Sequence, residues 1–319
     1  MVFGAQYALL PGKLFRKGND DFGFSTVLLM RIVRPASLVF YASLAIILGG
    51  VVTIVGALTM PYGGWFGLVP VLILAWRGLR QPLRRRRLAR QGIPEAWRVW
   101  LHDHVPFYAA LGEEARIRFE QDVQFFIDEQ TFEALDDLAV TDSLRLGVAA
   151  GAALLLHGRP DWELSTNRTI LFYPDRFDDE YYDGDYAAFD GMVHAQGPII
   201  LTASSVEADW ARPGNGHNVV LHELAHLFDF DQGGPEGTPS LLDPASAEAW
   251  RALVQREMRR VRLGTSLLRG YAATNPSEFF AVAVENFFDR PDVLHRRHPH
   301  LFEALVAFFN LDPRVGKGV

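Results

Sequence analysis

The sequence contains a stretch of 42 residues without a charged side chain, from Pro35 to Trp76. A single helix needs only about 20 apolar residues to cross a bilayer, so this stretch can hold two helices and a turn. The segment Met60-Pro-Tyr-Gly-Gly-Trp65 can form the turn, and its tyrosine and tryptophan suit a membrane interface. We therefore expect a transmembrane helical hairpin over residues 35–79, with spans near 38–58 and 65–79. A buried helical hairpin in a soluble protein is the alternative.

Basic residues flank this stretch on both sides and orient the expected hairpin. Residues 1–92 contain 12 Lys and Arg against 2 Asp and Glu, a net charge of +10. The positive-inside rule then puts both ends of the hairpin in the cytoplasm. Residues 1–34 are expected to be a cytoplasmic N-terminal segment, which can start at Met1 or Met30. Residues 80–92 are expected to be a basic juxtamembrane linker that contacts anionic lipid headgroups.

The remaining residues, 93–319, carry a net charge of −17 and are enough for one well-packed domain. This acidic charge argues against direct contact with nucleic acid. The absence of cysteine excludes disulfides and thiolate ligands. Hydrophobic periodicity predicts helices over 113–132, 139–156, 245–263, 278–289 and 299–310, and strands over 169–173 and 197–202. The expected fold class is α+β, mostly helical with a small sheet.

The predicted strand 197–202 contains a proline, which suits the edge of a sheet or the first position of a strand. An edge strand could hold an extended substrate backbone by adding it to the sheet. A plain core strand fits these residues equally well.

The pentapeptide His222-Glu-Leu-Ala-His226 indicates a metal site in this domain. Residues i and i+4 of a helix lie on the same face, so both imidazoles can reach one ion. Glu223 lies about 100° around the helix, where its carboxylate can reach a metal-bound water. Asp229 falls on the histidine face, and we expect it to orient a ligand histidine rather than bind the metal. Two packed core histidines beside a solvated glutamate are the structural alternative.

A tetrahedral catalytic site needs a third protein ligand, for which Glu278 is the best candidate. Asn275-Pro276 is typical of a helix start, which puts Glu278 at the third helical position. A glutamate there can equally complete a capping box, so these residues alone leave ligand and cap open. The remaining histidines have weaker geometric cases, and the last three are expected in an exposed turn: His194, His217, His295, His298 and His300.

The segments 222–229 and 271–278 together resemble the Mlc titration factor A family of bacterial zinc peptidases, whose catalytic domain is similar to that of anthrax lethal factor. The resemblance extends over roughly residues 85–315 and includes Tyr173-Pro174, Gly197-Pro-Ile-Ile-Leu201 and Glu285-Asn-Phe-Phe288. It implies that residues 93–319 form a zincin-like metallopeptidase domain. It also implies one Zn²⁺ per chain, bound by His222, His226 and Glu278. In addition, the resemblance implies that Glu223 is the general base and that Tyr271 donates a hydrogen bond to the developing oxyanion.

Two hypotheses for function follow. The first is a membrane-anchored zinc peptidase that cleaves a peptide or protein substrate, as an aminopeptidase or as an endopeptidase. The second is a regulatory binding protein that sequesters a transcriptional regulator and has weak or incidental peptidase activity, since members of the resembling family are named for binding a repressor. Glu223 favours catalysis, because a pure binding module does not need it.

Overall fold

The computed structural model describes Ile32 and residues 35–160, 162, 164, 168–174, 191–193, 197–228 and 244–314. By their contacts these residues belong to two compact units. One unit spans Asp21–Ile93, and the other contains Pro94–Val319.

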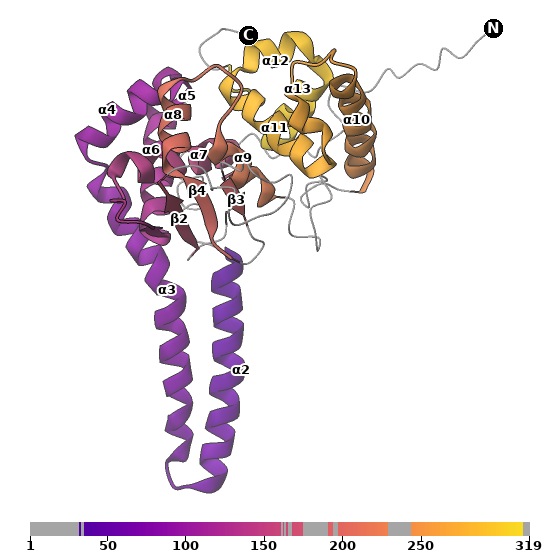
Figure 1. Cartoon of the computed structure of the whole chain (residues 1–319). Coiled ribbons are helices and arrows are strands. Elements are labelled where there is room, and N and C mark those ends of the chain that lie inside the picture. The colour runs from indigo at the N-terminus through magenta and orange to yellow at the C-terminus, as the bar shows by residue number, and fades with distance from the viewer. Residues whose placement is uncertain are drawn as a thin grey trace, which may run out of the picture. The chain divides into compact units, whose positions relative to one another are not determined.

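The smaller unit consists of two helices joined by a short 3-10 turn (Figure 1). α2 (Pro35–Thr59) is followed by η1 (Gly63–Gly67) and α3 (Leu68–Gln91). The two helices pack along each other through glycines. Gly56 and Gly63 lie so close beside the turn that neither has room for a Cβ, and a Cβ on Gly78 would lie 3.1 Å from the Cβ of Tyr41.

Among the described helices, α2 alone is both long and apolar enough to cross a membrane. Its segment Leu38–Thr59 covers 22 residues with a mean hydropathy of 2.5. The second predicted span, 65–79, does not form such a helix. α3 begins only at Leu68, and Arg77 ends its charge-free part after nine residues.

The larger unit contains a four-stranded mixed sheet in the order β1–β2–β4–β3. β1 (Thr131–Ala134), β2 (Thr169–Tyr173) and β4 (Ile199–Thr202) are parallel, and β3 (Gly191–Val193) runs antiparallel to β4. β2 has its predicted range. Of the two interpretations of the strand within 197–202, the edge strand and the core strand, the structure has the second, because β4 lies between β2 and β3. In the described sheet the edge strand beside β4 is β3, which was not predicted from the sequence.

Helices make up most of the larger unit (Figure 1). The five predicted helices match five observed ones within a few residues: α6 (Glu113–Glu129), α7 (Asp142–Leu156), α10 (Pro244–Arg262), α11 (Pro276–Asp289) and α13 (Pro299–Phe309). Helices that were not assigned from periodicity are α4 (Glu95–His104), α5 (Pro106–Ala110), α8 (Ala203–Ala211) and α12 (Pro291–Arg297). α6 ends early because Thr131 and Phe132, predicted as helix, pair with β2. The prediction of an exposed turn at the last three histidines is wrong: His295 lies within α12 and His300 within α13, and His298 between them is only 1% exposed.

The helix that carries the two histidines, α9 (Val219–His226), packs in the core against α7 and α11. α11 is buried on all sides from Phe279 to Phe288, as expected for a helix that is apolar around its whole circumference. Gly151 of α7 lies close to Val220 of α9. This packing buries every residue of α9 and fixes the position of both histidines.

Candidate metal centre

His222 and His226 lie one turn apart on α9, as their spacing predicts, and both are buried. The helix begins at Asn218, whose side chain accepts a hydrogen bond from the Leu221 amide at 3.0 Å. This cap fixes the first turn of a helix of only eight residues. The two imidazole rings are 5.0 Å apart between centroids and nearly perpendicular, at 82°.

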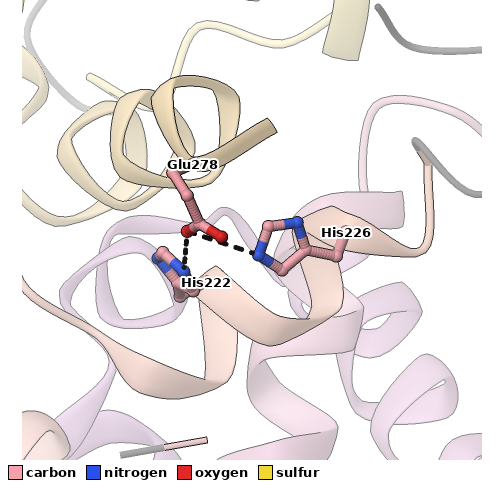
Figure 2. A group of neighbouring side chains, drawn as sticks. All are labelled: His222, His226 and Glu278. Atoms are coloured by element: carbon pink, nitrogen blue, oxygen red, sulfur yellow. Dashed lines mark hydrogen bonds and ion pairs between the residues drawn. The ribbon is translucent and has the colours of Figure 1, made fainter. Parts of the chain in front are cut away.

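Glu278 reaches these histidines from α11, as Figure 2 shows. Its Oε2 lies 2.9 Å from His222 Nε2 and 3.7 Å from His226 Nε2. The backbone amide of Glu278 donates to the side chain of Asn275 at 2.9 Å, so Asn275 caps the helix while the carboxylate faces the imidazoles. One ligand atom from each of the three residues lies within 4.8 Å of the others, which is a geometry that could hold a metal ion.

The charges in this cluster are strongly coupled. Burial opposes ionisation of Glu278, but hydrogen bonds from His222 and His226 outweigh it and hold the pKa of this carboxyl well below its usual range. Burial likewise lowers the pKa of His222, but hydrogen bonds to Glu278 and Glu285 prevail and raise it to about 10. A cation that binds here therefore competes with protons for the ring nitrogen.

Glu223 is buried on the same helix, and its carboxylate lies against β3. A Cβ built on Gly191 would lie 2.6 Å from Glu223 Cγ and 2.8 Å from its Oε1, so only glycine leaves room for this side chain. Burial is the main cause that raises the pKa of Glu223, to about 6. The carboxyl group is therefore mostly ionised at neutral pH and able to accept a proton.

Tyr271 lies beside the cluster on η3 (Gly270–Ala273). Its ring centroid is 5.9 Å from that of His222. Burial is the main cause that raises the pKa of Tyr271 above its usual value, and the negative charge of Glu278 adds to it. The hydroxyl therefore stays protonated and can donate a hydrogen bond.

Two further residues contact the Nδ1 atoms of the histidines, on the side of each ring opposite the nitrogen that faces Glu278. They were not recognised from the sequence. Glu285 Oε1 lies 2.7 Å from His222 Nδ1, and Ser277 Oγ lies 3.0 Å from His226 Nδ1. A single glutamate within the apolar run of α11 was a detectable signal for Glu285, whereas nothing in the sequence marks Ser277. Asp229, predicted to orient a ligand histidine, lies outside the described residues.

The histidines that the sequence rates as weaker candidates do not join the cluster where the structure describes them. His217 Nδ1 contacts Asp209 at 3.0 Å, and His298 Nδ1 contacts Glu257 at 2.7 Å. His295 lies 3.8 Å from Glu303. His194 is outside the described residues.

Comparison with known proteins points in the same direction as this geometry. Residues 79–310 match the model of the glucose-regulated metallo-peptidase M90 family. An uncharacterized protein of Synechocystis sp. is 32% identical over 249 residues, which cover 73% of this chain and 90% of the relative. Mlc titration factor A of Yersinia enterocolitica is 27% identical over 240 residues, 68% of this chain and 85% of the relative. The protein of the same name from Yersinia pestis (strain Pestoides F) is 27% identical over 233 residues, 66% and 83%.

Two substitutions test whether Glu278 is a metal ligand or only part of the cap of α11. Losing a residue that only hydrogen-bonds to a metal ligand typically weakens metal binding ~10- to 100-fold. We expect Glu278→Ala to weaken zinc binding by more than this, because it removes a ligand. Asn275→Ala removes the cap of the same helix and should lower the free energy of unfolding by about 1 kcal/mol while zinc affinity stays unchanged. Zinc titration against a chromophoric chelator and chemical denaturation of the metal-free proteins measure the two effects. Equal zinc affinity in wild type and Glu278→Ala would show that Glu278 is not a ligand.

Proposed function

The chain belongs to the glucose-regulated metallo-peptidase M90 family, and on that premise we propose that it is a zinc-dependent peptidase. One zinc ion per chain is held by His222, His226 and Glu278. The observation that carries the proposal is the convergence of these three ligand atoms within 4.8 Å of one another.

The donor set fits zinc. Two imidazole nitrogens and one carboxylate oxygen are a combination found in catalytic zinc sites, which keep a further position open for water or substrate. When bound, zinc lowers the pKa of a bound water toward ~7 and polarises the substrate carbonyl. Two neighbouring side chains, Glu223 and Tyr271, would then accept the proton of the water and stabilise the developing negative charge.

Glu223 follows His222 directly on α9 and is the general base of the proposed reaction. Because its pKa is about 6, it is ionised at neutral pH and can take a proton from the attacking water. It can then return this proton to the leaving amine. Tyr271, protonated beside the cluster, donates a hydrogen bond to the oxyanion that forms on the substrate.

β3 is the part of the sheet best suited to hold the substrate. It contacts α9, and it is the edge strand beside β4 in the described sheet. A peptide added to this edge in extended form would run past Glu223, which lies against Gly191. Either an aminopeptidase or an endopeptidase is compatible with this arrangement.

A second function rests on the relatives named Mlc titration factor A. A member of this family could bind a transcriptional regulator, with peptidase activity weak or incidental. The side chains of Glu223 and Tyr271 favour the peptidase, because sequestering a partner requires neither a buried base nor a protonated phenol at a metal cluster.

We also propose that α2 and α3 anchor the protein in the inner membrane, with the catalytic domain in the cytoplasm. The glycine contacts set the register of the pair, so that Gly78 lies level with Tyr41. From Tyr41 to Thr59, α2 is about 27 Å long at ~1.5 Å per residue, close to the ~30 Å of a hydrocarbon core. The turn and the first part of α3 cover the same depth, so Arg77 falls at the basic end rather than in the middle of the bilayer.

Aromatic side chains mark both ends of this pair. Tyr62 and Trp65 are exposed at the turn, and Trp76 is exposed near the other end, where the Arg80 guanidinium lies 5.5 Å from its ring centroid. Two such belts suit the two interfaces of a bilayer. Arg84, Arg86 and Arg87 are exposed, so they then lie beyond the membrane and can contact anionic lipid headgroups, whereas Arg85 is buried.

Glu223→Gln separates metal binding from catalysis. The amide cannot accept the proton, so we expect hydrolysis to fall by ~10²- to 10⁴-fold while one zinc per chain is retained. Full-length protein in detergent should be assayed for zinc content and for cleavage of a peptide library. Unchanged turnover would rule out the proposed base. Zinc in both proteins with hydrolysis in neither would instead favour the sequestering function.

Gly191→Ala tests the contact between β3 and the base. The added Cβ must displace the Glu223 carboxylate, and a shift of about 1 Å in a catalytic group can reduce the rate ~10²-fold. We expect kcat to fall by that order with zinc content unchanged. Gly112→Ala is the matched control, because a Cβ there meets nothing within 4 Å. Wild-type kcat in Gly191→Ala would contradict this placement of Glu223.

The membrane topology can be read with single cysteines, because the sequence contains none. We expect Tyr62→Cys to react with a membrane-impermeant maleimide added to intact spheroplasts. Arg90→Cys, beyond the opposite end of the pair, should react only after the spheroplasts are lysed. If Tyr62→Cys did not react with the maleimide in intact spheroplasts, the membrane-spanning pair would be contradicted. Release of the wild-type protein by carbonate washing would contradict it as well.

A further inference from the structure

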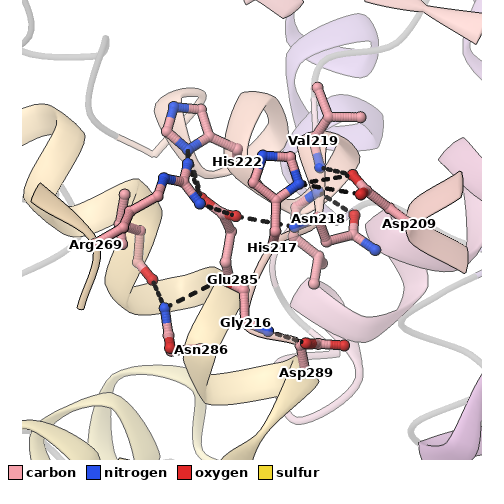
Figure 3. Close-up of polar contacts among 12 residues, drawn as sticks. Asp209, Gly216, His217, Asn218, Val219, His222, Arg269, Glu285, Asn286 and Asp289 are labelled. Carbon is pink, nitrogen blue, oxygen red and sulfur yellow. Dashed lines mark hydrogen bonds and ion pairs between the residues drawn. The ribbon is translucent and has the colours of Figure 1, made fainter. Parts of the chain in front are cut away.

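Glu285 is a fully buried carboxylate, 0% exposed, that lies two turns after Glu278 on α11. Its two oxygens accept four hydrogen bonds (Figure 3). Oε1 accepts from His222 Nδ1 at 2.7 Å, and Oε2 accepts from the backbone amide of Asn218 at 2.9 Å. Arg269 donates to both oxygens, at 2.8 Å and 2.7 Å. The carboxylate is therefore held in a single orientation.

The bond to His222 decides which of its ring nitrogens carries the proton. Nδ1 donates to Glu285, so the lone pair of a neutral His222 is on Nε2. Nε2 is the nitrogen that faces Glu278, at 2.9 Å. Because Glu285 also binds the Asn218 amide at the start of α9, it fixes the helix and the ring together.

Arg269 connects this carboxylate to Tyr271. It precedes Tyr271 by two residues, and its guanidinium carbon lies 5.8 Å from the centre of the Tyr271 ring. The same ring is 5.9 Å from that of His222. The ion pair of Glu285 and Arg269 thus contacts the two segments that carry His222 and Tyr271.

We propose that Glu285 and Arg269 are positioning residues that set the tautomer and direction of His222 and the place of Tyr271 in the metal centre. This inference rests on the zinc peptidase proposed above. Hydrogen-bonded partners of metal-binding histidines typically contribute ~10- to 100-fold to metal affinity. A purely structural buried ion pair would contribute to folding and leave metal affinity unchanged.

The chain contains a matched control for that alternative. Glu257 of α10 is also buried, 3% exposed, and it contacts His298 Nδ1 at 2.7 Å and Arg260 Nη1 at 2.9 Å. This second group of glutamate, histidine and arginine has similar contacts but no part in the metal cluster. Its loss should affect stability alone.

The test compares Glu285→Gln with Glu257→Gln in the full-length protein. Zinc affinity is measured at fixed pH by competition with a chromophoric chelator, and the absorption spectrum of the cobalt-substituted protein reports ligand geometry. We expect zinc affinity to fall ~10- to 100-fold in Glu285→Gln, together with a changed cobalt spectrum. Glu257→Gln should retain wild-type zinc affinity and the wild-type spectrum.

Equal zinc affinity in wild type and Glu285→Gln would overturn the proposal, and so would an equal loss in both variants. If Glu285→Gln does not fold, Arg269→Gln replaces it, because this side chain is 32% exposed and is removed at less cost to the core. We expect weaker zinc binding and a lower kcat at saturating zinc in Arg269→Gln; wild-type values of both would overturn the proposal. Failure of the wild-type chain to bind zinc would instead contradict the zinc peptidase itself.

Discussion

Buried carboxylates and imidazoles are tolerated in a protein core only when each has a partner, and this requirement governs the centre of the larger unit. α11 is apolar on all sides, yet it brings Glu278 and Glu285 into contact with α9. The two carboxylates hold opposite nitrogens of one ring, that of His222. The geometry of the cluster therefore depends on the packing of two core helices rather than on a loop, which suits a site that must keep its ligands in place.

Features that depend on neighbours in the sequence could be predicted. The one-turn spacing of His222 and His226 follows from helix geometry alone. The pair Asn275-Pro276 begins its helix as predicted, because side-chain caps and proline act within one turn. Apolar periodicity located the longer helices to within a few residues, since each must bury one face. Whether Glu278 faces the histidines or its own cap depended on the packing of α11, which the local sequence does not specify.

Features that depend on pairing across long distances could not be predicted. The residues of β4 fit an edge strand or a core strand equally, and the position of β3 on its far side decided between them. β3 has only three residues and therefore no periodicity of its own. The charge-free stretch predicted two helices for the smaller unit, but it placed the second at 65–79 and a linker at 80–92, whereas α3 begins at Leu68 and continues through the arginines to Gln91.

The two buried groups of glutamate, histidine and arginine show why such contacts alone do not identify a site. In both, a carboxylate contacts histidine Nδ1 at 2.7 Å and an arginine Nη1 within 3 Å. They differ at the second ring nitrogen. His298 Nε2 accepts a hydrogen bond from the Leu267 amide at 3.0 Å, so its lone pair is already used. His222 Nε2 faces the carboxylate of Glu278 in a cluster that can admit a cation. The partner of the second ring nitrogen, rather than the buried ion pair, therefore distinguishes the two histidines: His222 Nε2 faces the side chain of another candidate ligand, whereas His298 Nε2 faces a backbone amide.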